Sequence, residues 1–172
     1  MKDMLLSGYS RHNDLSPMRL LCRGKSVLDL GANIGLLAYE ALSNGATSVD
    51  LVEFSQENHD VISHILAPSS SNSVTAYKAD LTKKSLQSIL PHLSFDTVFF
   101  LATYQHLEKQ NAGSGSQILR EIVESINPEY LVFRSKGYSD IAKDFILSSG
   151  MRLLYTSNLN EELAPLFIFK RD

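Results

Sequence analysis

The chain has one cysteine, no long apolar run and no excess of basic residues. A single thiol, Cys22, excludes an internal disulfide framework and a cysteine-rich zinc site, because both need several thiols. No stretch reaches the roughly 20 apolar residues of a transmembrane helix, and none near the start is long enough for a signal peptide. The formal net charge of -3 gives no overall attraction to nucleic acid, although a local basic patch stays possible. We therefore expect a cytoplasmic protein that does not bind a membrane, and the charge does not indicate nucleic acid as a partner.

The composition is typical of one globular domain. The length of 172 residues corresponds to a single domain. Hydrophobic residues make up 44% and charged residues 20%, which supplies enough apolar surface for a core and excludes a disordered segment or a fibre. We expect residues 25–172 to form the domain and residues 1–24 an N-terminal arm that could cover a cofactor.

Apolar runs of strand length alternate with segments of helical period through most of the chain. This alternation predicts a parallel sheet covered by helices. The last two predicted strands have no helix between them, so we expect them to pair antiparallel. The predicted fold is α/β: a doubly wound, mostly parallel seven-stranded sheet with a C-terminal antiparallel strand pair and helices on both faces. The predicted strands are 26–30, 49–53, 74–78, 95–101, 130–134, 151–156 and 165–170, and the predicted helices lie within 34–42, 55–66, 81–93, 118–126 and 141–149.

A glycine-containing turn follows the first predicted strand, where that strand enters a helix. In an open α/β sheet the carboxyl ends of the strands are where ligands bind, and glycine lets the backbone approach a ligand closely. The start of the next helix presents free N–H groups to an anion. Asn33 stands where the dinucleotide fingerprint G-x-G-x-x-G needs its second glycine, so that fingerprint fails. The pattern that remains is D-x-G-x-x-x-G, from Asp29 to Gly35.

This turn, together with acidic residues at later strand ends, resembles the class I S-adenosylmethionine-dependent methyltransferases. The resemblance covers about residues 25 to 170 and implies S-adenosylmethionine as cofactor. It places Glu53 on the ribose hydroxyls, Asp80 with Leu81 at the adenine, and the segment from Leu101 beside the sulfonium. The residues that it assigns to cofactor binding are Asp29, Gly31, Asn33, Gly35, Glu53, Phe54, Asp80, Leu81 and Leu101, with Tyr9 and Arg11 in the N-terminal arm.

The segment after the fourth predicted strand carries the candidate catalytic residues, His106 and Tyr104. His106 is at a position that in many small-molecule methyltransferases faces the acceptor, and imidazole is a suitable base near neutral pH. The alternative is that His106 only caps a helix or lies on the surface. The sequence Leu101-Ala102-Thr103-Tyr104 lacks the Asn/Asp-Pro-Pro-Tyr pattern of amino methyltransferases of nucleic-acid bases. The five histidines are scattered, so we expect no metal site.

The resemblance implies a methyltransferase that acts on a small molecule or on an exposed polar group of a larger acceptor. Gly113-Ser114-Gly115 predicts a loop, which we expect to span Leu107 to Gln117. This loop and the others that usually recognise the acceptor are short, so a homodimer or a partner subunit could complete its pocket. One alternative is a non-catalytic S-adenosylmethionine-binding module or a subunit of a methyltransferase complex. A weaker alternative is an NAD-type oxidoreductase, against which Asn33 argues.

Overall fold

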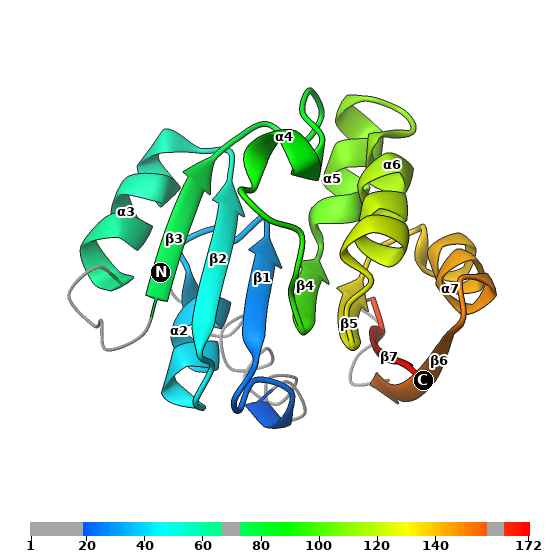
Figure 1. The fold of residues 1–172 in the computed structure, drawn as a ribbon. Coiled ribbons are helices and arrows are strands. Elements are labelled where there is room, and N and C mark those ends of the chain that lie inside the picture. Colours follow the sequence, from blue (N-terminus) through cyan, green and yellow to red (C-terminus); the bar gives the residue numbers. More distant parts are fainter. Residues whose placement is uncertain (1–18, 67–72, 158–163) are drawn as a thin grey trace, which may run out of the picture.

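The computed structural model describes residues 19–66, 73–157 and 164–172, and these form one sheet with helices on both faces (Figure 1). Within these residues the sheet has seven strands in the order β3-β2-β1-β4-β5-β7-β6. The strands are β1 (Ser26–Leu30), β2 (Ser48–Glu53), β3 (Ser73–Lys78), β4 (Thr97–Leu101), β5 (Tyr130–Arg134), β6 (Met151–Ser157) and β7 (Leu166–Arg171). The first five are parallel, and β7 is antiparallel to both β5 and β6. The predicted fold class is therefore confirmed.

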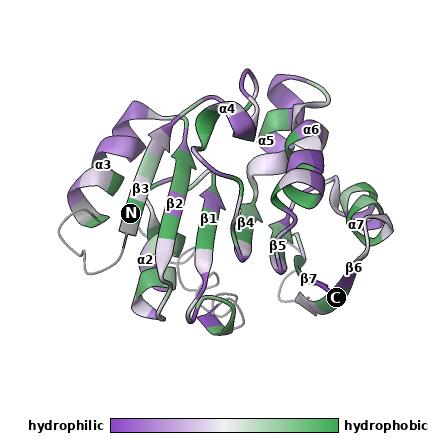
Figure 2. Ribbon diagram, in the orientation of Figure 1, coloured by the Kyte–Doolittle hydropathy of each residue, from purple (hydrophilic) through white to green (hydrophobic). Residues whose placement is uncertain are grey.

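The helices form two layers. The described helices are α2 (Leu36–Ser43), α3 (Gln56–Leu66), α4 (Leu86–Ile89), α5 (Thr103–Gln110), α6 (Ser114–Glu121), the π-helix η2 (Ile122–Ile126) and α7 (Ser139–Ser148). Buried residues of α2 and α3 pack in one core with the strand residues Val27, Leu51 and Phe99. Residues of α4 to α7 pack in a second core with the alternate strand residues, such as Leu28 and Phe100. Successive strand residues point to opposite faces, which is why near-continuous apolar strands support two cores. Figure 2 shows the central strands as largely hydrophobic and hydrophilic stretches on α3 and α6.

The helix expected within Leu81–Leu93 is much shorter than the sequence pattern predicts. It covers only Leu86–Ile89. The Asp80 side chain closes a turn before it, the Ser85 side chain accepts a hydrogen bond from its first turn, and Pro91 follows its end. These local turn and cap interactions compete with helix continuation.

The segment Leu107–Gln117, expected to be a loop, is mostly helical. The helix α5 runs through it to Gln110, and α6 begins at Ser114. Gly115, which the sequence pattern predicts in a loop, lies inside α6, where an added Cβ would approach the Tyr104 carbonyl oxygen to 2.8 Å. The glycine therefore marks a close approach of two helices.

The first described residues pack on the domain. The Leu21 carbonyl accepts a hydrogen bond of 2.9 Å from the Thr97 hydroxyl, and the Cys22 side chain is buried. Arg19 forms an ion pair of 3.3 Å with Glu40 of α2. Arg19, Leu21 and Cys22 therefore already contact the domain before β1 begins at Ser26. No helix in the described part of the chain is both long and apolar enough to cross a membrane.

Candidate functional site

The turn after β1 holds three residues in the left-handed backbone region. Gly31 has φ 79, Asn33 φ 53 and Gly35 φ 81. Asparagine tolerates this region better than other side chains, because its short amide bonds to nearby backbone. Asn33 thus takes a conformation that glycine usually supplies. An added Cβ at Gly35 would lie 3.2 Å from the Ile62 side chain, so Gly35 also lets α2 start close to α3.

Glu53, at the end of β2, joins two turns at this edge of the sheet. One carboxylate oxygen accepts a hydrogen bond of 2.8 Å from the Asn33 N–H, and the other accepts one of 2.7 Å from the Ser55 N–H. The side chain is buried at 8% exposure. A carboxylate has about four lone-pair sites, so two remain for further donors. The geometry leaves Glu53 able to accept from a ligand hydroxyl.

Asp29 lies next to Glu53 on the same face of the sheet, and it is even more buried. Its exposure is 2%, and its Oδ2 atom has no hydrogen-bond partner within residues 19–66, 73–157 and 164–172. Burial, with a smaller contribution from the nearby Glu53 charge, raises its pKa to about 7. A buried polar atom without a partner is rare in folded proteins and calls for a ligand or another explanation. The two carboxyl groups together make this corner a place for hydrogen-bond donors.

The structure places the other predicted cofactor residues in different surroundings. Asp80 accepts hydrogen bonds from the Thr82 N–H and hydroxyl, at 3.0 and 2.6 Å, and pairs with Lys83 at 3.0 Å. The Thr82 hydroxyl is the main reason that the pKa of Asp80 is lowered. Leu81 is buried in the core, whereas Phe54 beside Glu53 is 63% exposed.

Leu101 is half-buried at the end of β4, where it packs against the core of α2 and α3. Tyr9 and Arg11 lie outside the described residues. The structure thus brings together Asp29, Glu53 and the glycine turn, while Asp80 is engaged with its own loop.

The two candidate catalytic residues on α5 differ in exposure. Tyr104 is 3% exposed, and its ring packs edge-on against Phe133 with centroids 5.7 Å apart. Its hydroxyl shares a hydrogen bond of 2.8 Å with Ser116, and burial raises its pKa. The Tyr104 side chain is therefore part of the hydrophobic core. His106 is exposed on the same helix.

Sequence reasoning missed Thr103 and Ala102, which connect β4 to α5. Ala102 has φ 60, an unusual value for a residue with a Cβ. The Thr103 hydroxyl donates to the Leu30 carbonyl at 2.8 Å, so it reaches the turn after β1. A hydroxyl residue just inside a helix start is a weak signal in sequence, and its partner lies 73 residues away.

Comparison with known proteins connects this architecture to a fold family. No family model and no curated protein matches the sequence. Among solved structures, an S-adenosylmethionine dependent methyltransferase from Mesorhizobium loti matches with a TM-score of 0.70 and 17% identity, over 96% of this chain and 100% of that one. The 16S rRNA methylase RmtB matches with a TM-score of 0.70 and 17% identity, over 97% of this chain and 66% of that one.

This chain has the class I S-adenosylmethionine-dependent methyltransferase fold. The [4+2]-cyclase SpnF also matches, with a TM-score of 0.70 and 13% identity, over 94% of this chain and 81% of that one. The class I fold alone therefore leaves the reaction open. In residues 19–66, 73–157 and 164–172, no group of three or more His, Cys, Asp or Glu residues could hold a metal ion.

Proposed function

We propose that this protein binds S-adenosylmethionine and transfers its methyl group to an acceptor. The observation that carries the proposal is the corner formed by the glycine turn after β1, the buried Asp29 carboxyl, whose Oδ2 atom has no partner in the described part of the chain, and the Glu53 carboxylate. It lies at the carboxyl ends of adjacent strands, where ligands of open α/β sheets bind. The class I fold supports the choice of cofactor.

The residues present fit the cofactor. Glu53 has free lone pairs for the ribose hydroxyls, and the exposed ring of Phe54 is beside it for the adenine. Asp29 offers an acceptor to a donor group of the ligand. When bound, S-adenosylmethionine supplies a methyl group on a sulfonium, and the leaving thioether is neutral and needs no acid.

The protein's own contribution is then mainly positioning. Holding donor and acceptor in line makes the reaction effectively intramolecular, which corresponds to effective molarities up to about 10⁵–10⁸ M. His106 would take a proton from an acceptor that has one to lose. Tyr104 is left out of this role, because its ring is buried in the core and its hydroxyl shares a hydrogen bond with Ser116.

We propose a small molecule, or an exposed polar group of a larger molecule, as the acceptor. His106 is exposed at the β4–α5 corner, so a flexible or protruding acceptor group could reach it. A second copy of the chain or a partner subunit would complete the wall of the pocket. A cytoplasmic location belongs to the same proposal.

Titration calorimetry with S-adenosylmethionine and S-adenosylhomocysteine tests the cofactor. We expect binding by the wild type and at least about tenfold weaker binding by Glu53→Gln, which removes a charged acceptor. Glu57→Gln is the matched control, because Glu57 is an exposed residue in the first turn of α3. It should bind like the wild type.

Absence of binding to the wild type would overturn the proposal, and binding of NADH instead would favour an oxidoreductase. A methyl-release assay over candidate acceptors separates the enzyme from the alternative of a binding module. Binding without turnover on any acceptor would favour the module.

A further inference from the structure

The first residue of α5, Thr103, makes a contact that its position in the helix does not explain. Threonine at a helix start usually bonds to N–H groups of its own helix. Here the Thr103 Oγ1 instead donates to the carbonyl oxygen of Leu30 at 2.8 Å, with the Leu101 carbonyl at 3.3 Å. The hydroxyl thus links α5 to the last residue of β1, immediately before the glycine turn.

The backbone of Gly31 packs directly against the Thr103 side chain. A Cβ built on Gly31 would lie 2.1 Å from the Thr103 Oγ1 and 3.0 Å from its methyl carbon. Thr103 therefore fills the space that a side chain at residue 31 would occupy. The first residue of α5 is packed directly on the turn that we assign to the cofactor.

The start of α5 is also held from its other side. The Ala102 N–H donates to the Arg134 carbonyl at 2.9 Å, and the Gln105 side chain accepts a hydrogen bond from the Lys136 N–H. These bonds tie α5 to the end of β5. His106 comes three residues after Thr103, which places the two side chains on neighbouring turns of one helix face. A shift at Leu30 and Gly31 would therefore reach His106 through Thr103.

We propose that Thr103 is a positioning residue that couples the cofactor turn to the acceptor side of the site. Its hydroxyl holds α5 against the β1 turn, so occupation of the cofactor site sets the placement of His106. This inference rests on the proposed function, and it adds a residue that connects the cofactor turn to His106 on the acceptor side.

The test compares variants in calorimetry with S-adenosylhomocysteine and in NMR of the His106 ring, assigned by comparison with His106→Gln. Thr103→Val removes the hydroxyl and keeps the shape, while Thr103→Ser keeps the hydroxyl. Thr97→Val is the matched control, because the buried Thr97 hydroxyl also donates to a backbone carbonyl, that of Leu21 at 2.9 Å, but at the opposite end of β4.

In the wild type we expect saturating S-adenosylhomocysteine to shift the His106 ring signal. In Thr103→Val the ligand should bind about three to ten times more weakly, the effect of one lost hydrogen bond. Its His106 shift at saturation should fall by more than half. Thr103→Ser and Thr97→Val should keep the wild-type shift and affinity. If Thr103→Val does not fold, Thr103→Ala replaces it with the same expectations.

Three results would overturn the coupling: no His106 shift in the wild type despite ligand binding, a full shift in the variant without the hydroxyl, or an equal loss in Thr97→Val. Failure of the wild type to bind S-adenosylhomocysteine is a different result, since it overturns the proposed function itself. The two failures are therefore distinguishable.

Discussion

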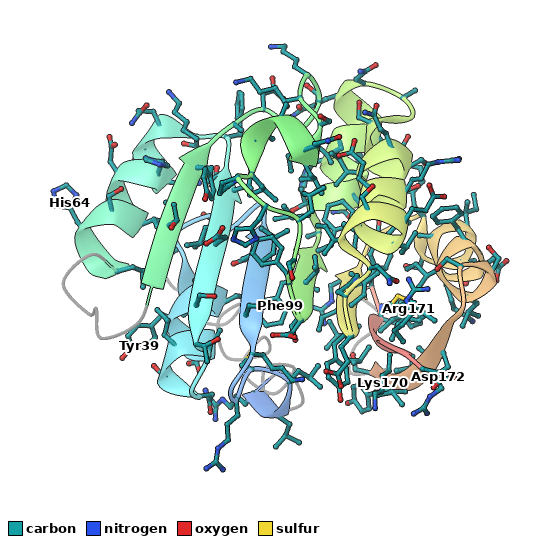
Figure 3. All side chains as sticks on the ribbon, in the orientation of Figure 1. Tyr39, His64, Phe99, Lys170, Arg171 and Asp172 are labelled. Carbon is teal, nitrogen blue, oxygen red and sulfur yellow. The ribbon has the colours of Figure 1, made fainter. Side chains whose placement is uncertain are left out.

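At the amino ends of the strands, several polar side chains bond to other groups of the protein. The Asp96 carboxylate accepts hydrogen bonds of 2.8 Å from both the N–H and the hydroxyl of Ser26. Lys25 forms an ion pair with Glu129. Arg171 donates to the Val123 carbonyl at 2.8 Å, while its buried Nε atom has no partner among the described residues. Figure 3 shows Arg171 with its neighbours Lys170 and Asp172 at the C-terminal end of β7, which lies at this side of the sheet.

The carboxyl ends of the strands are different. There Glu53 accepts from backbone N–H groups of two turns, and the Oδ2 atom of Asp29 has no partner among the described residues. The non-glycine residues Asn33 and Ala102 take positive φ values in the same region, and Asn127 does so before β5 at the other end. Strained backbone and unsatisfied polar groups lower stability, and they often cluster at functional sites. The comparison teaches that ion pairs and hydrogen bonds within the protein predominate at the amino ends, whereas the carboxyl ends bring two buried carboxyl groups beside a turn with positive φ values, where the proposed ligand would bind.

The largest expected effect is that of Gly31→Ala. The new Cβ would lie 2.1 Å from the Thr103 Oγ1, and the alanine would have to keep the φ of 79 that Gly31 has. We therefore expect a loss of about 3–5 kcal/mol in the free energy of unfolding. Gly24→Ala is the control, since Gly24 has φ 71 with no atom within 4 Å of the added Cβ. It should lose only about 1–2 kcal/mol. Urea denaturation measures both, and equal losses would contradict the close contact of Thr103 with the turn.

Asp29→Asn should change how stability depends on pH. The pKa of Asp29 is raised from 3.8 to about 7, mainly by burial. The protonated form is the one that the folded state favours, so stability present at low pH is lost as the pH rises through about 7. The amide of the Asp29→Asn variant stays neutral at every pH, so the variant does not lose this stability as the pH rises. At pH 8 we expect it to be more stable than the wild type by a few kcal/mol.

Near pH 4 the Asp29→Asn variant and the wild type should have similar stability, because both carry a neutral group there. Unfolding by urea at the two pH values measures the difference. If the difference in the free energy of unfolding between the two proteins does not vary with pH, the charge of Asp29 is not the cause of that difference. The same variant should bind S-adenosylhomocysteine more weakly if the carboxylate serves the ligand.

Asp96→Ala probes the amino ends of the strands. It removes two hydrogen bonds with Ser26, and we expect a loss of about 1–3 kcal/mol in stability with no change in affinity for S-adenosylhomocysteine. The backbone hydrogen bond from Ser26 is the main cause of the lowered pKa of Asp96. Its stabilisation is therefore present above the unfolded pKa and is lost as the pH falls through the folded one. A change in ligand affinity would contradict the separation of the two ends.

The smallest expected effect is that of Glu129→Gln. The Lys25 and Glu129 side chains are 29% and 35% exposed, and such ion pairs contribute about 0.2–1 kcal/mol. The loss should shrink further in high salt, because salt screens exposed charges. Thermal unfolding at low and high salt checks this, and a loss as large as that of Asp96→Ala would show that the pair is more important than its exposure indicates.

Much of the fold could be predicted, because its signals are local. The predicted strands agree with the structure to within two residues at each end, since buried parallel strands form short, uniformly apolar runs. The insertion of β7 between β5 and β6 was not predicted. The order of the strands depends on which strands meet in space, and the amino-acid composition of a strand does not predict its neighbours in the sheet.

The errors in the helices have a similar origin. Between Leu81 and Leu93 the side chains of Asp80 and Ser85 form a turn and a cap that shorten the helix. At Gly115 the sequence pattern suggested a loop, while the close contact with Tyr104 required a glycine inside a helix. The sequence does not distinguish a glycine in a loop from a glycine at a close helix contact, because only the position of the neighbouring helix separates the two cases.

By itself the sequence determined the alternation of strands and helices, the glycine turn after β1 and the acidic residues at strand ends, because each depends on neighbours in the chain. Tertiary structure alone decided that Asp29 has a buried atom without a partner among the residues that the structure describes, that Tyr104 points into the core, and that Thr103 packs on Gly31. These features arise from contacts between residues far apart in the chain. Such contacts depend on how the helices pack on the sheet, which no local pattern specifies.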